Sequence, residues 1–456
     1  MIYKISAKFI LLFMSIAVFF NGLSFPAAKL GSCGDMTVEY VFENDRAYSA
    51  AGTVSISDAA DRTYDLYWGD EKGDILKTDE NGTKATYGEF ATVEVKDGTG
   101  SADVYEFTAI PDGAKTVIAR VGKTEVKTIE LPENKQPENE KPLYRFGALS
   151  DVHFNRYRLS LTDDAMIAFP NALNFFKAYG VKLVGLSGDL SNRSELDSFK
   201  KYNSVVSEYD FPVYTSTGNH DVNDNFSLEN WQKYVNTGVY GEKKDSGIAD
   251  VAANGLDFVY APDGENGDIF IFYSQYRWSY NHDDSRILTD AQLDWLENQL
   301  NKYKNNTVFL FFHTFLANDS EDDPYSGVGN LINDKGVYYN LMFTRNTPDE
   351  VRFRSLLRDN KNVVFFSGHS HWSFAMQRFN ERLNISDYDG EYCTMVHISS
   401  VSSPRTVKNG STDKNERFLR QSEGYLVSVY PDRIILTGVD FYMHELLSYA
   451  NYVIER

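Results

Sequence analysis

Five short segments of the chain place metal-binding side chains directly after runs of apolar residues. The segments are residues 150–153 (Ser-Asp-Val-His), 187–192 (Ser-Gly-Asp-Leu-Ser-Asn), 217–221 (Thr-Gly-Asn-His-Asp), 311–314 (Phe-Phe-His-Thr) and 367–371 (Ser-Gly-His-Ser-His). They contain five of the eight histidines of the chain. Ligands of open α/β sheets bind at the carboxyl ends of the strands. The pattern therefore predicts that Asp, Asn and His side chains meet at one edge of a sheet.

The types of these side chains indicate a transition-metal site. A mixture of carboxylate, imidazole and amide oxygen suits Mn, Fe, Zn or Co better than Ca or Mg alone. There are too many donors for one tetrahedral zinc, so two ions that share one carboxylate would use them all. Two ions about 3.5–4 Å apart clamp a phosphoryl group and lower the pKa of a bridging water. The residues thus predict hydrolysis of a phosphate ester by attack of a metal-bound hydroxide.

The order of the five motifs resembles that of the calcineurin-like metallophosphoesterase family. Asp-x-His, Gly-Asp, Gly-Asn-His-Asp, a single His and Gly-His-x-His follow one another within about residues 143–440. Any one of these motifs is a weak signal, but all five in this order, each after an apolar run, are specific. The resemblance implies a metal-dependent phosphoric ester hydrolase with a layered α/β/α metallophosphoesterase-type sandwich. It also implies two divalent or trivalent transition-metal ions, Mn, Fe or Zn.

The resemblance further implies a role for each side chain of the motifs. The expected metal ligands form three groups: Asp151, His153 and His371 on one ion, Asn219, His313 and His369 on the other, and Asp189 as the bridge. His220 would not ligate but would act as the general acid at the leaving group or hold the phosphate. Asn219 and Arg193 would also contact the phosphate of the substrate.

One position departs from the pattern of the protein phosphatases of this family. Asn192 stands where they carry an Asp that orients and charges the catalytic histidine. An amide can orient an imidazole but cannot stabilise imidazolium as a carboxylate does. Asn192 is therefore predicted to orient His220. Either the imidazole of His220 loses its proton more readily than in those phosphatases, or Asp221 or another acid supplies the missing carboxylate. Purple acid phosphatases have a metal-binding Tyr at this position, and its absence argues against an Fe–Tyr centre.

Alternating β-rich and amphipathic stretches predict the fold that positions these motifs, in a domain of residues 143–456. Apolar β-rich runs occur at 144–149, 182–186, 212–215, 269–273, 307–312 and 362–366, and again near 394–399, 425–430 and 433–439. Amphipathic segments occur at 161–179, 195–209, 290–304 and 349–359. This alternation favours an α/β architecture.

The part of the chain before this domain has a different pattern. Residues 36–131 show seven short alternating runs at roughly ten-residue spacing, which predicts a small all-β sandwich domain at 33–131. It contains no His and no cluster of reactive groups, so we expect an accessory or spacer module. Residues 132–142 contain three prolines and no other apolar residue, which is typical of an extended linker.

Residues 1–32 are predicted to be a signal peptide. Lys4 and Lys8 precede residues 9–20, which are apolar except for Ser15. This pattern is typical of a secretory signal, and the apolar run is too short to span a bilayer, which needs about 20 residues. The sequence Leu-Gly-Ser-Cys that ends at Cys33 resembles a bacterial lipoprotein box. An extracytoplasmic location is expected, either secreted or at the cell surface with membrane anchoring through lipidated Cys33.

Composition limits the partners of the protein. The formal net charge is -20, from 45 basic and 65 acidic residues, so no nucleic acid duplex is expected as a partner. The two cysteines exclude a disulfide scaffold and a four-thiolate metal site. The expected substrate is a phosphorylated small molecule or head group.

Some alternatives remain open from the sequence. A phosphodiesterase or nucleotidase is not distinguished from a phosphomonoesterase. A catalytically inactive extracellular binding protein is disfavoured, because every expected ligand and His220 are present. The remaining histidines His282, His397 and His444 are predicted to be structural, and segments 222–260 and 316–348 are candidates for the walls of the substrate site.

Overall fold

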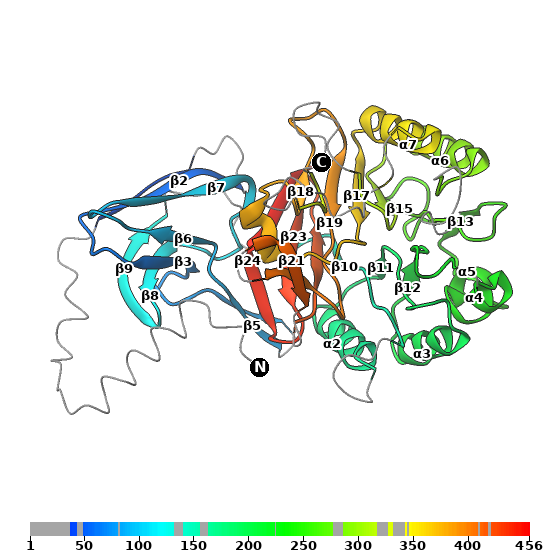
Figure 1. Ribbon diagram of the computed structural model, residues 1–456, viewed down its shortest axis with the longest axis horizontal. Coiled ribbons are helices and arrows are strands. Elements are labelled where there is room, and N and C mark those ends of the chain that lie inside the picture. The colour runs from blue at the N-terminus through cyan, green and yellow to red at the C-terminus, as the bar shows by residue number, and fades with distance from the viewer. Residues whose placement is uncertain are drawn as a thin grey trace. The chain divides into compact units, whose positions relative to one another are not determined.

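A computed structural model describes most of the chain after the predicted leader (Figure 1). The described residues are 37–42, 49–80, 83–131, 140–155, 163–223, 225–276, 286–316, 327–331, 343, 346–408, 411–417 and 421–456. The predicted signal peptide, Cys33, His282, most of the linker and most of segment 316–348 lie outside them. None of the helices in these ranges is long and apolar enough to cross a membrane.

The chain divides into two compact units. One runs to Leu76 and resumes at Tyr87–Gln136, and the other consists of Lys77–Thr86 and Pro137–Arg456. The hairpin of β4 (Lys77–Glu80) and β5 (Thr83–Tyr87) therefore groups mainly with the second unit, although it precedes the linker in sequence. The predicted domain boundaries at residues 131 and 142 stay predictions.

The first unit is all-β, as its alternating pattern predicts. Its strands are β1 (Thr37–Phe42), β2 (Ser49–Ser57), β3 (Thr63–Gly69), β6 (Ala91–Glu94), β7 (Gly100–Ala109), β8 (Thr116–Val121) and β9 (Thr124–Glu130). Strands β1, β2 and β7 pair in that order, and β6, β3, β8 and β9 form a four-stranded sheet. Alternate residues of β3, Tyr64, Leu66 and Trp68, are buried, which is the two-residue period of a strand with one face in a core.

The second unit contains two large sheets, each with a run of parallel strands. The first sheet has the order β24 (Glu445–Glu455), β23 (Arg433–Asp440), β22 (Glu423–Val429), β10 (Tyr144–Leu149), β11 (Val184–Leu186) and β12 (Val213–Thr215). The second has the order β13 (Ile248–Val251), β14 (Phe258–Tyr260), β15 (Ile269–Phe272), β16 (Val308–Phe311), β17 (Val363–Ser367), β19 (Thr394–His397) and β18 (Ile385–Ser386). Strands β10 to β12 are parallel, as are β15, β16, β17 and β19.

Aromatic side chains pack the two sheets against each other. The ring of Phe146 in β10 meets the rings of Phe309 and Phe270 edge-on, at centroid distances of 4.8 and 5.2 Å. It also meets Phe366 of β17, at 6.1 Å. Such edge-to-face pairs add stability beyond the apolar area that they bury. The β layer of the expected α/β/α sandwich is therefore a stack of two sheets.

Helices cover the outer faces of this stack (Figure 1). They are α2 (Ala165–Ala178), α3 (Leu196–Val206), α4 (Leu228–Tyr234), α5 (Thr237–Tyr240), α6 (Asp290–Lys302) and α7 (Pro348–Asp359). Leu296 of α6 and Phe353 of α7 share a core cluster with Leu310 of β16. The N-cap of α6 is Thr289, which forms a capping box with Gln292, and this arrangement fixes where the helix begins.

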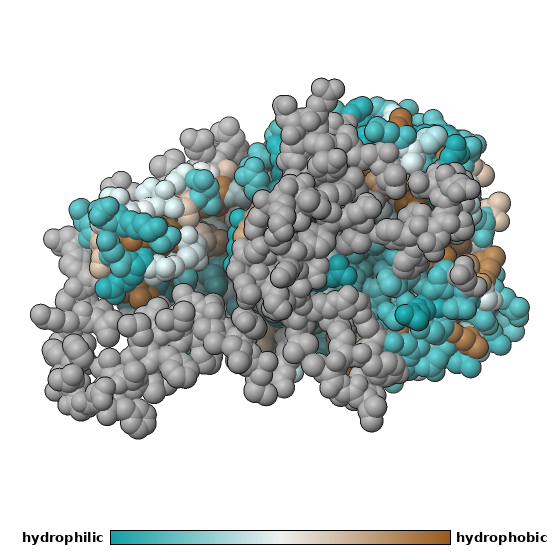
Figure 2. Space-filling model, viewed as in Figure 1, coloured by the Kyte–Doolittle hydropathy of each residue, from teal (hydrophilic) through white to brown (hydrophobic). Residues whose placement is uncertain are grey.

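The remaining elements are short. A 3-10 turn, η3, spans Phe374–Phe379, and β20 (Arg405–Lys408) pairs antiparallel with β21 (Ser411–Arg417). Figure 2 shows mostly hydrophilic residues on the visible described face of the second unit, with single apolar residues scattered among them. Scattered apolar residues of this kind are normal on a globular surface.

Candidate metal centre

The five predicted segments follow the carboxyl ends of strands in the two stacked sheets. Asp151 follows β10, Asp189 follows β11 and Asn219 follows β12, all in the first sheet. His313 follows β16, and residues 369–371 follow β17, in the second sheet. The expected ligands are all buried, with exposed fractions of 8% or less. Topology therefore brings both sheets' polar loops to one edge, as the sequence predicts.

One group of donor atoms surrounds the side chain of Asp151. His371 Nε2 lies 3.0 Å from Asp151 Oδ1, and His153 Nε2 lies 3.1 Å from His371 Nε2. His153 Nε2 is also 3.6 Å from Asp189 Oδ2. One donor atom from each of these four residues lies within 4.8 Å of the others, which is close enough for a single ion to contact all of them.

A second group of donor atoms surrounds His313. Its Nε2 lies 3.0 Å from His369 Nδ1, 3.1 Å from Asn219 Oδ1 and 3.2 Å from Asp189 Oδ2. Asp189 Oδ2 therefore faces both groups of donors. Its other oxygen, Oδ1, accepts the backbone N–H of His220 at 2.9 Å. This is the arrangement expected of a carboxylate that bridges two ions.

The side chains fit two metal ions on structural grounds. Ring nitrogens of His153 and His371 face one another, and the buried Asp151 Oδ1 faces His371 Nε2 at 3.0 Å, a nitrogen that carries no proton when the ring is neutral and protonated on Nδ1. A buried acceptor left in this way costs about 1–3 kcal/mol, so an unsatisfied one calls for an explanation such as an ion. Mixed imidazole, carboxylate and amide donors suit transition metals. The identity of the metals does not follow from these donors.

The backbone at the ligands is in an unfavourable conformation. The φ angles of Asp151, His153, Asp189, His369 and His371 are 56°, 52°, 52°, 74° and 62°, respectively. Left-handed backbone at a non-glycine residue costs about 1–3 kcal/mol and concentrates at functional sites. The surrounding contacts must therefore impose these conformations, and they aim the side chains inward.

Backbone carbonyls orient two of the imidazoles. His313 Nδ1 lies 2.6 Å from the carbonyl oxygen of Ser187, and His371 Nδ1 lies 3.1 Å from that of Ser403. Because a carbonyl oxygen only accepts, the proton of each neutral ring is on Nδ1. The Nε2 lone pair of each ring then points at the donor groups, which is the tautomer that binds a metal through Nε2.

The electrostatics favour the protonation state that metal binding needs at Asp151 and His369 and oppose it at His313. Burial would raise the pKa of Asp151, but neighbouring His371 and His153 hold it well below its ordinary value. Burial lowers the pKa of His369 to about 3, and His313 adds to the effect. For His313, burial is outweighed by Asp189, and the pKa is raised to about 9. Metal ligands must be deprotonated, so Asp151 and His369 are already in their binding states.

His220 lies beside the two donor groups and is half-buried. Its ring centroid is 4.8 Å from that of His153, and its Nδ1 lies 2.7 Å from the backbone carbonyl oxygen of Asn192. The prediction that the amide of Asn192 orients the ring is thus corrected: the backbone carbonyl makes this contact. The sequence could not indicate it, because every residue has a carbonyl.

The prediction that Asp221 supports His220 is wrong. The buried carboxylate of Asp221 accepts hydrogen bonds from the backbone N–H groups of Leu190, Ser191 and Gly218 at 2.8–3.1 Å, and from the Ser191 hydroxyl at 2.8 Å. Burial, with nearby Asp189, raises its pKa to about 6. Asp221 therefore joins the loops that carry Asp189 and Asn219, and it acts on their position.

Other predicted residues lie further from the donors. Arg193 is exposed, and its backbone N–H donates to Glu195 Oε2 at 2.8 Å, so its contact with phosphate stays a prediction. Segment 222–260 forms α4, α5, β13 and β14.

Ser150 was not predicted to have a role at the site, although its hydroxyl donates to Asp151 Oδ2 at 2.7 Å. Its position directly before Asp151 in the motif is the sequence feature that could have indicated this contact.

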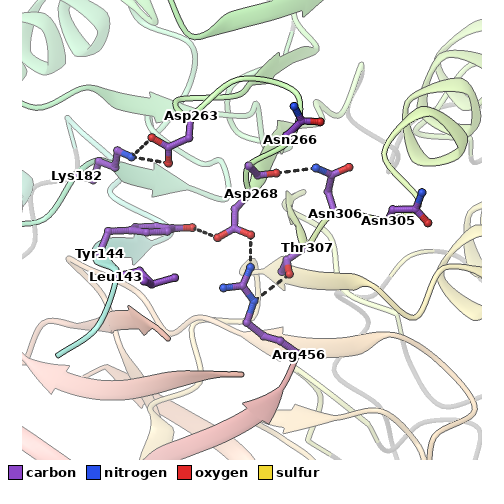
Figure 3. Close-up of a pocket in the computed structure, with 11 residues that line it drawn as sticks. Leu143, Tyr144, Lys182, Asp263, Asn266, Asp268, Asn305, Asn306, Thr307 and Arg456 are labelled. Carbon is purple, nitrogen blue, oxygen red and sulfur yellow. Dashed lines mark hydrogen bonds and ion pairs between the residues drawn. The ribbon is translucent and has the colours of Figure 1, made fainter. Parts of the chain in front are cut away.

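A separate pocket of about 460 Å³ lies at the amino ends of the same strands (Figure 3). Tyr144 begins β10, Lys182 precedes β11, Asp268 precedes β15 and Thr307 precedes β16. None of the expected metal ligands lines it. The two ends of these strands thus hold different polar clusters.

The charges at this pocket are matched. Lys182 Nζ lies 2.6 Å from each carboxylate oxygen of Asp263. The Tyr144 hydroxyl donates to Asp268 Oδ2 at 2.7 Å, and the guanidinium of Arg456 pairs with the same carboxylate. Figure 3 shows these pairs across the pocket. They connect the first sheet, which carries Tyr144 and Arg456, to the start of β15 in the second.

Comparison with known proteins identifies the family. A sequence model of the calcineurin-like phosphoesterase family matches residues 144–373, which is half of the chain. The chain therefore belongs to the calcineurin-like phosphoesterases, and it is a metal-dependent phosphoric ester hydrolase.

Individual relatives are distant. A protein of Fibrobacter succinogenes described as a probable cyclic nucleotide phosphodiesterase is 28% identical over 175 residues, which cover 38% of this chain and 58% of that protein. A dimetal phosphatase from Danio rerio is 14% identical, with a TM-score of 0.43 over 69% of this chain and 99% of its own. The structure of PhoD is 10% identical, with a TM-score of 0.39 over 92% of this chain and 91% of its own.

Proposed function

We propose that this protein is an exported hydrolase of phosphate esters that uses two metal ions and His220 as general acid. The observation that carries the proposal is the position of Asp189 Oδ2, which faces His153 at 3.6 Å on one side and His313 at 3.2 Å on the other. A carboxylate oxygen shared by two groups of donors is what a dinuclear site requires.

The chain's own residues would divide the work as follows. Asp151, His153 and His371 would hold one ion, Asn219, His313 and His369 the other, and Asp189 both. When bound, the two ions supply a clamp for the phosphoryl group and lower the pKa of water. The polypeptide holds these ligands in place through the backbone carbonyls of Ser187 and Ser403 and through the carboxylate of Asp221.

His220 is proposed to move a proton rather than to bind metal. Its Nδ1 donates to the carbonyl oxygen of Asn192, which leaves Nε2 as the nitrogen that can protonate the leaving oxygen of the ester. General acid catalysis of this kind contributes about 10²–10⁴ in rate. Arg193 and Asn219 are proposed contacts of the phosphate, and Arg193 would neutralise part of its charge.

The substrate class that we favour is a phosphodiester of a small molecule, with cyclic nucleotides first. This preference is supported by the relative from Fibrobacter succinogenes described as a probable cyclic nucleotide phosphodiesterase. The chain spans 58% of that protein's length, so its substrate comes to this chain only as a proposal. Phosphomonoesters, nucleotides and phospholipid head groups are the alternatives to test beside it.

Export is proposed from the sequence of residues 1–32. Lys4 and Lys8 before an apolar run support a secretory leader, and Cys33 is the position that a lipid would occupy. Mass spectrometry of the protein from its own cells tests both parts. A mature N-terminus at Cys33 carrying a lipid mass indicates anchoring, an unmodified new N-terminus indicates secretion, and an intact Met1 in the cytoplasm overturns the export proposal.

A substrate panel with metal removal tests the catalytic proposal. The purified chain is assayed against bis(p-nitrophenyl) phosphate, p-nitrophenyl phosphate, cyclic nucleotides, nucleoside monophosphates and glycerophosphodiesters. We expect diester hydrolysis that a strong chelator abolishes and added Mn²⁺, Fe²⁺ or Zn²⁺ restores. Full activity in the chelated protein would overturn the dinuclear mechanism, and activity on monoesters alone would overturn the proposed substrate class.

A further inference from the structure

A buried segment that the motifs do not include lies against one half of the metal centre. Residues 397–405 read His-Ile-Ser-Ser-Val-Ser-Ser-Pro-Arg, and we call them the strap. Every residue from His397 to Pro404 is buried. The strap leaves β19 where His397 pairs with Ser367, the last residue of β17. It therefore starts beside the loop that carries His369 and His371.

The strap binds the loop of Asp151 from behind. The backbone N–H of Val401 donates to the carbonyl oxygen of Ser150 at 3.1 Å, and the Ser400 hydroxyl donates to that of Asp151 at 2.8 Å. The same hydroxyl accepts the N–H of Ser403 at 2.9 Å. A single side chain, Ser400, thus links the backbone of Asp151 to the next turn of the strap. Asp151 has left-handed backbone, so this contact bears on where its carboxylate points.

The other end of the strap binds His371. The carbonyl oxygen of Ser403 accepts from the Nδ1 of His371 at 3.1 Å, and the N–H of Arg405 donates to the carbonyl oxygen of His371 at 2.6 Å. The first contact fixes the ring and the second fixes the backbone. Ser400 and Ser403 are joined by a hydrogen bond, so Asp151 and His371, both expected on the same ion, are held by one continuous structure.

His397 holds the residue that follows His371. Its Nε2 lies 3.2 Å from the carbonyl oxygen of Trp372 and 3.3 Å from Ser370 Oγ, and its Nδ1 is buried without a hydrogen-bond partner. Because the carbonyl only accepts, Nε2 carries the proton. Burial lowers the pKa of His397 to about 4, so the ring is neutral at ordinary pH. His397 therefore supplies one N–H group and no charge.

His313, in the other donor group, is held by different parts of the chain. His313 Nδ1 donates to Ser187, and the His313 carbonyl oxygen accepts the N–H of Gly368. We propose that the strap is a positioning element for Asp151 and His371, and that it sets the affinity of the ion between them more than that of the ion on His313. This inference rests on the two-metal site proposed above. It assigns Ser400 and His397, which touch neither ion, as positioning residues.

The test measures metal binding to the full chain. Ser400→Ala and His397→Leu remove the two side-chain contacts, and His397→Gln keeps an amide N–H near the position of Nε2. Ser448→Ala is the matched control, because Ser448 in β24 is also buried and its hydroxyl has no hydrogen-bond partner. Each apoprotein is titrated with Mn²⁺ by calorimetry, and its thermal unfolding without metal confirms that it is folded.

We expect the wild-type protein and Ser448→Ala each to bind two ions. The affinity for each ion should be the same in both proteins. Ser400→Ala and His397→Leu should lower the affinity for one ion by about 10–100-fold. This is the usual effect of removing a hydrogen-bond partner of a metal ligand. His397→Gln should recover most of the loss. Because the readout is the affinity of each ion, a general loss of stability would not produce this pattern.

Two double variants identify which ion the strap affects. In His313→Ala the remaining ion is the one on Asp151, His153 and His371, and adding Ser400→Ala should lower the affinity for it. In His371→Ala, adding Ser400→Ala should leave the affinity for the remaining ion unchanged. The strap proposal would be overturned if Ser400→Ala lowered the affinity for both ions equally, or for neither. Either result would leave the two-metal hydrolase intact. A wild-type chain that binds no ion would overturn the hydrolase mechanism itself.

Discussion

The metal centre and the pocket at the opposite end of the same strands both place carboxylates beside nitrogen-bearing side chains, but their charges are balanced differently. At the pocket, Asp263 meets Lys182 and Asp268 meets Arg456. At the metal centre, imidazole nitrogens face other imidazole nitrogens, and Asp151 Oδ1 has no hydrogen-bond partner. The charged side chains of the pocket pair with one another, whereas the donors of the metal centre are arranged so that bound cations would pair with them.

The backbone conformation also differs between the metal centre and the pocket. Asp151, Asp189 and His371 have positive φ angles, and no non-glycine residue that lines the described pocket does. Strain is retained where a function depends on the geometry that it imposes. Matched, unstrained charges at one end of the strands are suited to stabilising the fold, and the strained donors at the other end are those that we propose to carry the chemistry.

The largest effect is expected from the bridging residue. Asp189→Asn should reduce kcat/KM by about a thousandfold or more, because a two-ion clamp supplies several kcal/mol of transition-state stabilisation and each 1.36 kcal/mol is tenfold. Steady-state kinetics on the best diester measure this loss. Asp263→Asn is the matched control at the opposite end of the strands, and its activity should equal that of wild type. Retained hydrolysis in Asp189→Asn would show that Asp189 is not a bridging ligand.

A smaller loss of rate is expected from the general acid. His220→Ala should keep both ions and lower kcat by about 10²–10⁴, most strongly for esters with poor leaving groups. Metal analysis of the purified variant, together with a series of leaving groups, separates the two possible roles. Loss of an ion from His220→Ala would make this residue a ligand and contradict its position beside the donor groups.

A substitution at the pocket should lower the stability of the protein and leave its catalytic rate unchanged. Asp268→Ala leaves Arg456 and Tyr144 without their partner carboxylate, which costs about 2 kcal/mol for a largely buried group. Thermal unfolding should show a melting temperature lower by about 2–4 °C per kcal/mol, while kcat/KM stays within twofold, a tolerance on the order of 0.4 kcal/mol. A loss of activity comparable to that of Asp189→Asn would end the distinction between the two ends.

The smallest effect is expected from the exposed pair. The side chains of Lys182 and Asp263 are 35% and 52% exposed, so Lys182→Ala should cost less than about 1 kcal/mol. Adding salt should reduce the difference from wild type, because salt screens exposed charges. Thermal unfolding at two salt concentrations checks this. An effect larger than that of Asp268→Ala would show that exposure does not decide which of these pairs stabilises the fold.

The metal centre could be predicted from sequence because each ligand follows its strand almost at once. The run before His313, residues 307–312, contains the fully buried strand β16, and β10 has the predicted bounds 144–149. When short buried strands end in polar residues, the parallel arrangement brings those residues together. Position along the chain was therefore enough to predict which of the expected ligands lie close to Asp189.

The contacts that position the ligands could not be predicted in this way. The partners of His220, His313 and His371 are backbone carbonyl oxygens, which every residue type supplies. The role of Asp221 was misjudged for a related reason: its neighbour in sequence is His220, but its hydrogen bonds go to backbone N–H groups of other loops. Sequence shows which side chains are present and not which backbone groups they meet.

Some strands were missed because their composition is ambiguous. Strand β24 spans Glu445–Glu455, and its Ser, Asn and Tyr residues interrupt the apolar run. Its polar residues Ser448 and Asn451 are nevertheless buried. The hairpin of β4 and β5 is mostly polar and short. In both cases pairing with neighbouring strands decides the structure, and tertiary contacts of this kind override local preference.

The metal content of fully active wild-type protein is the most direct test of a two-metal hydrolase. We expect about two transition-metal ions per chain, with activity rising in proportion to the ions bound when the chelated protein is titrated with metal. Elemental analysis beside the activity assay measures both quantities on the same sample. Full hydrolytic activity in protein that contains almost no metal would contradict a two-metal mechanism.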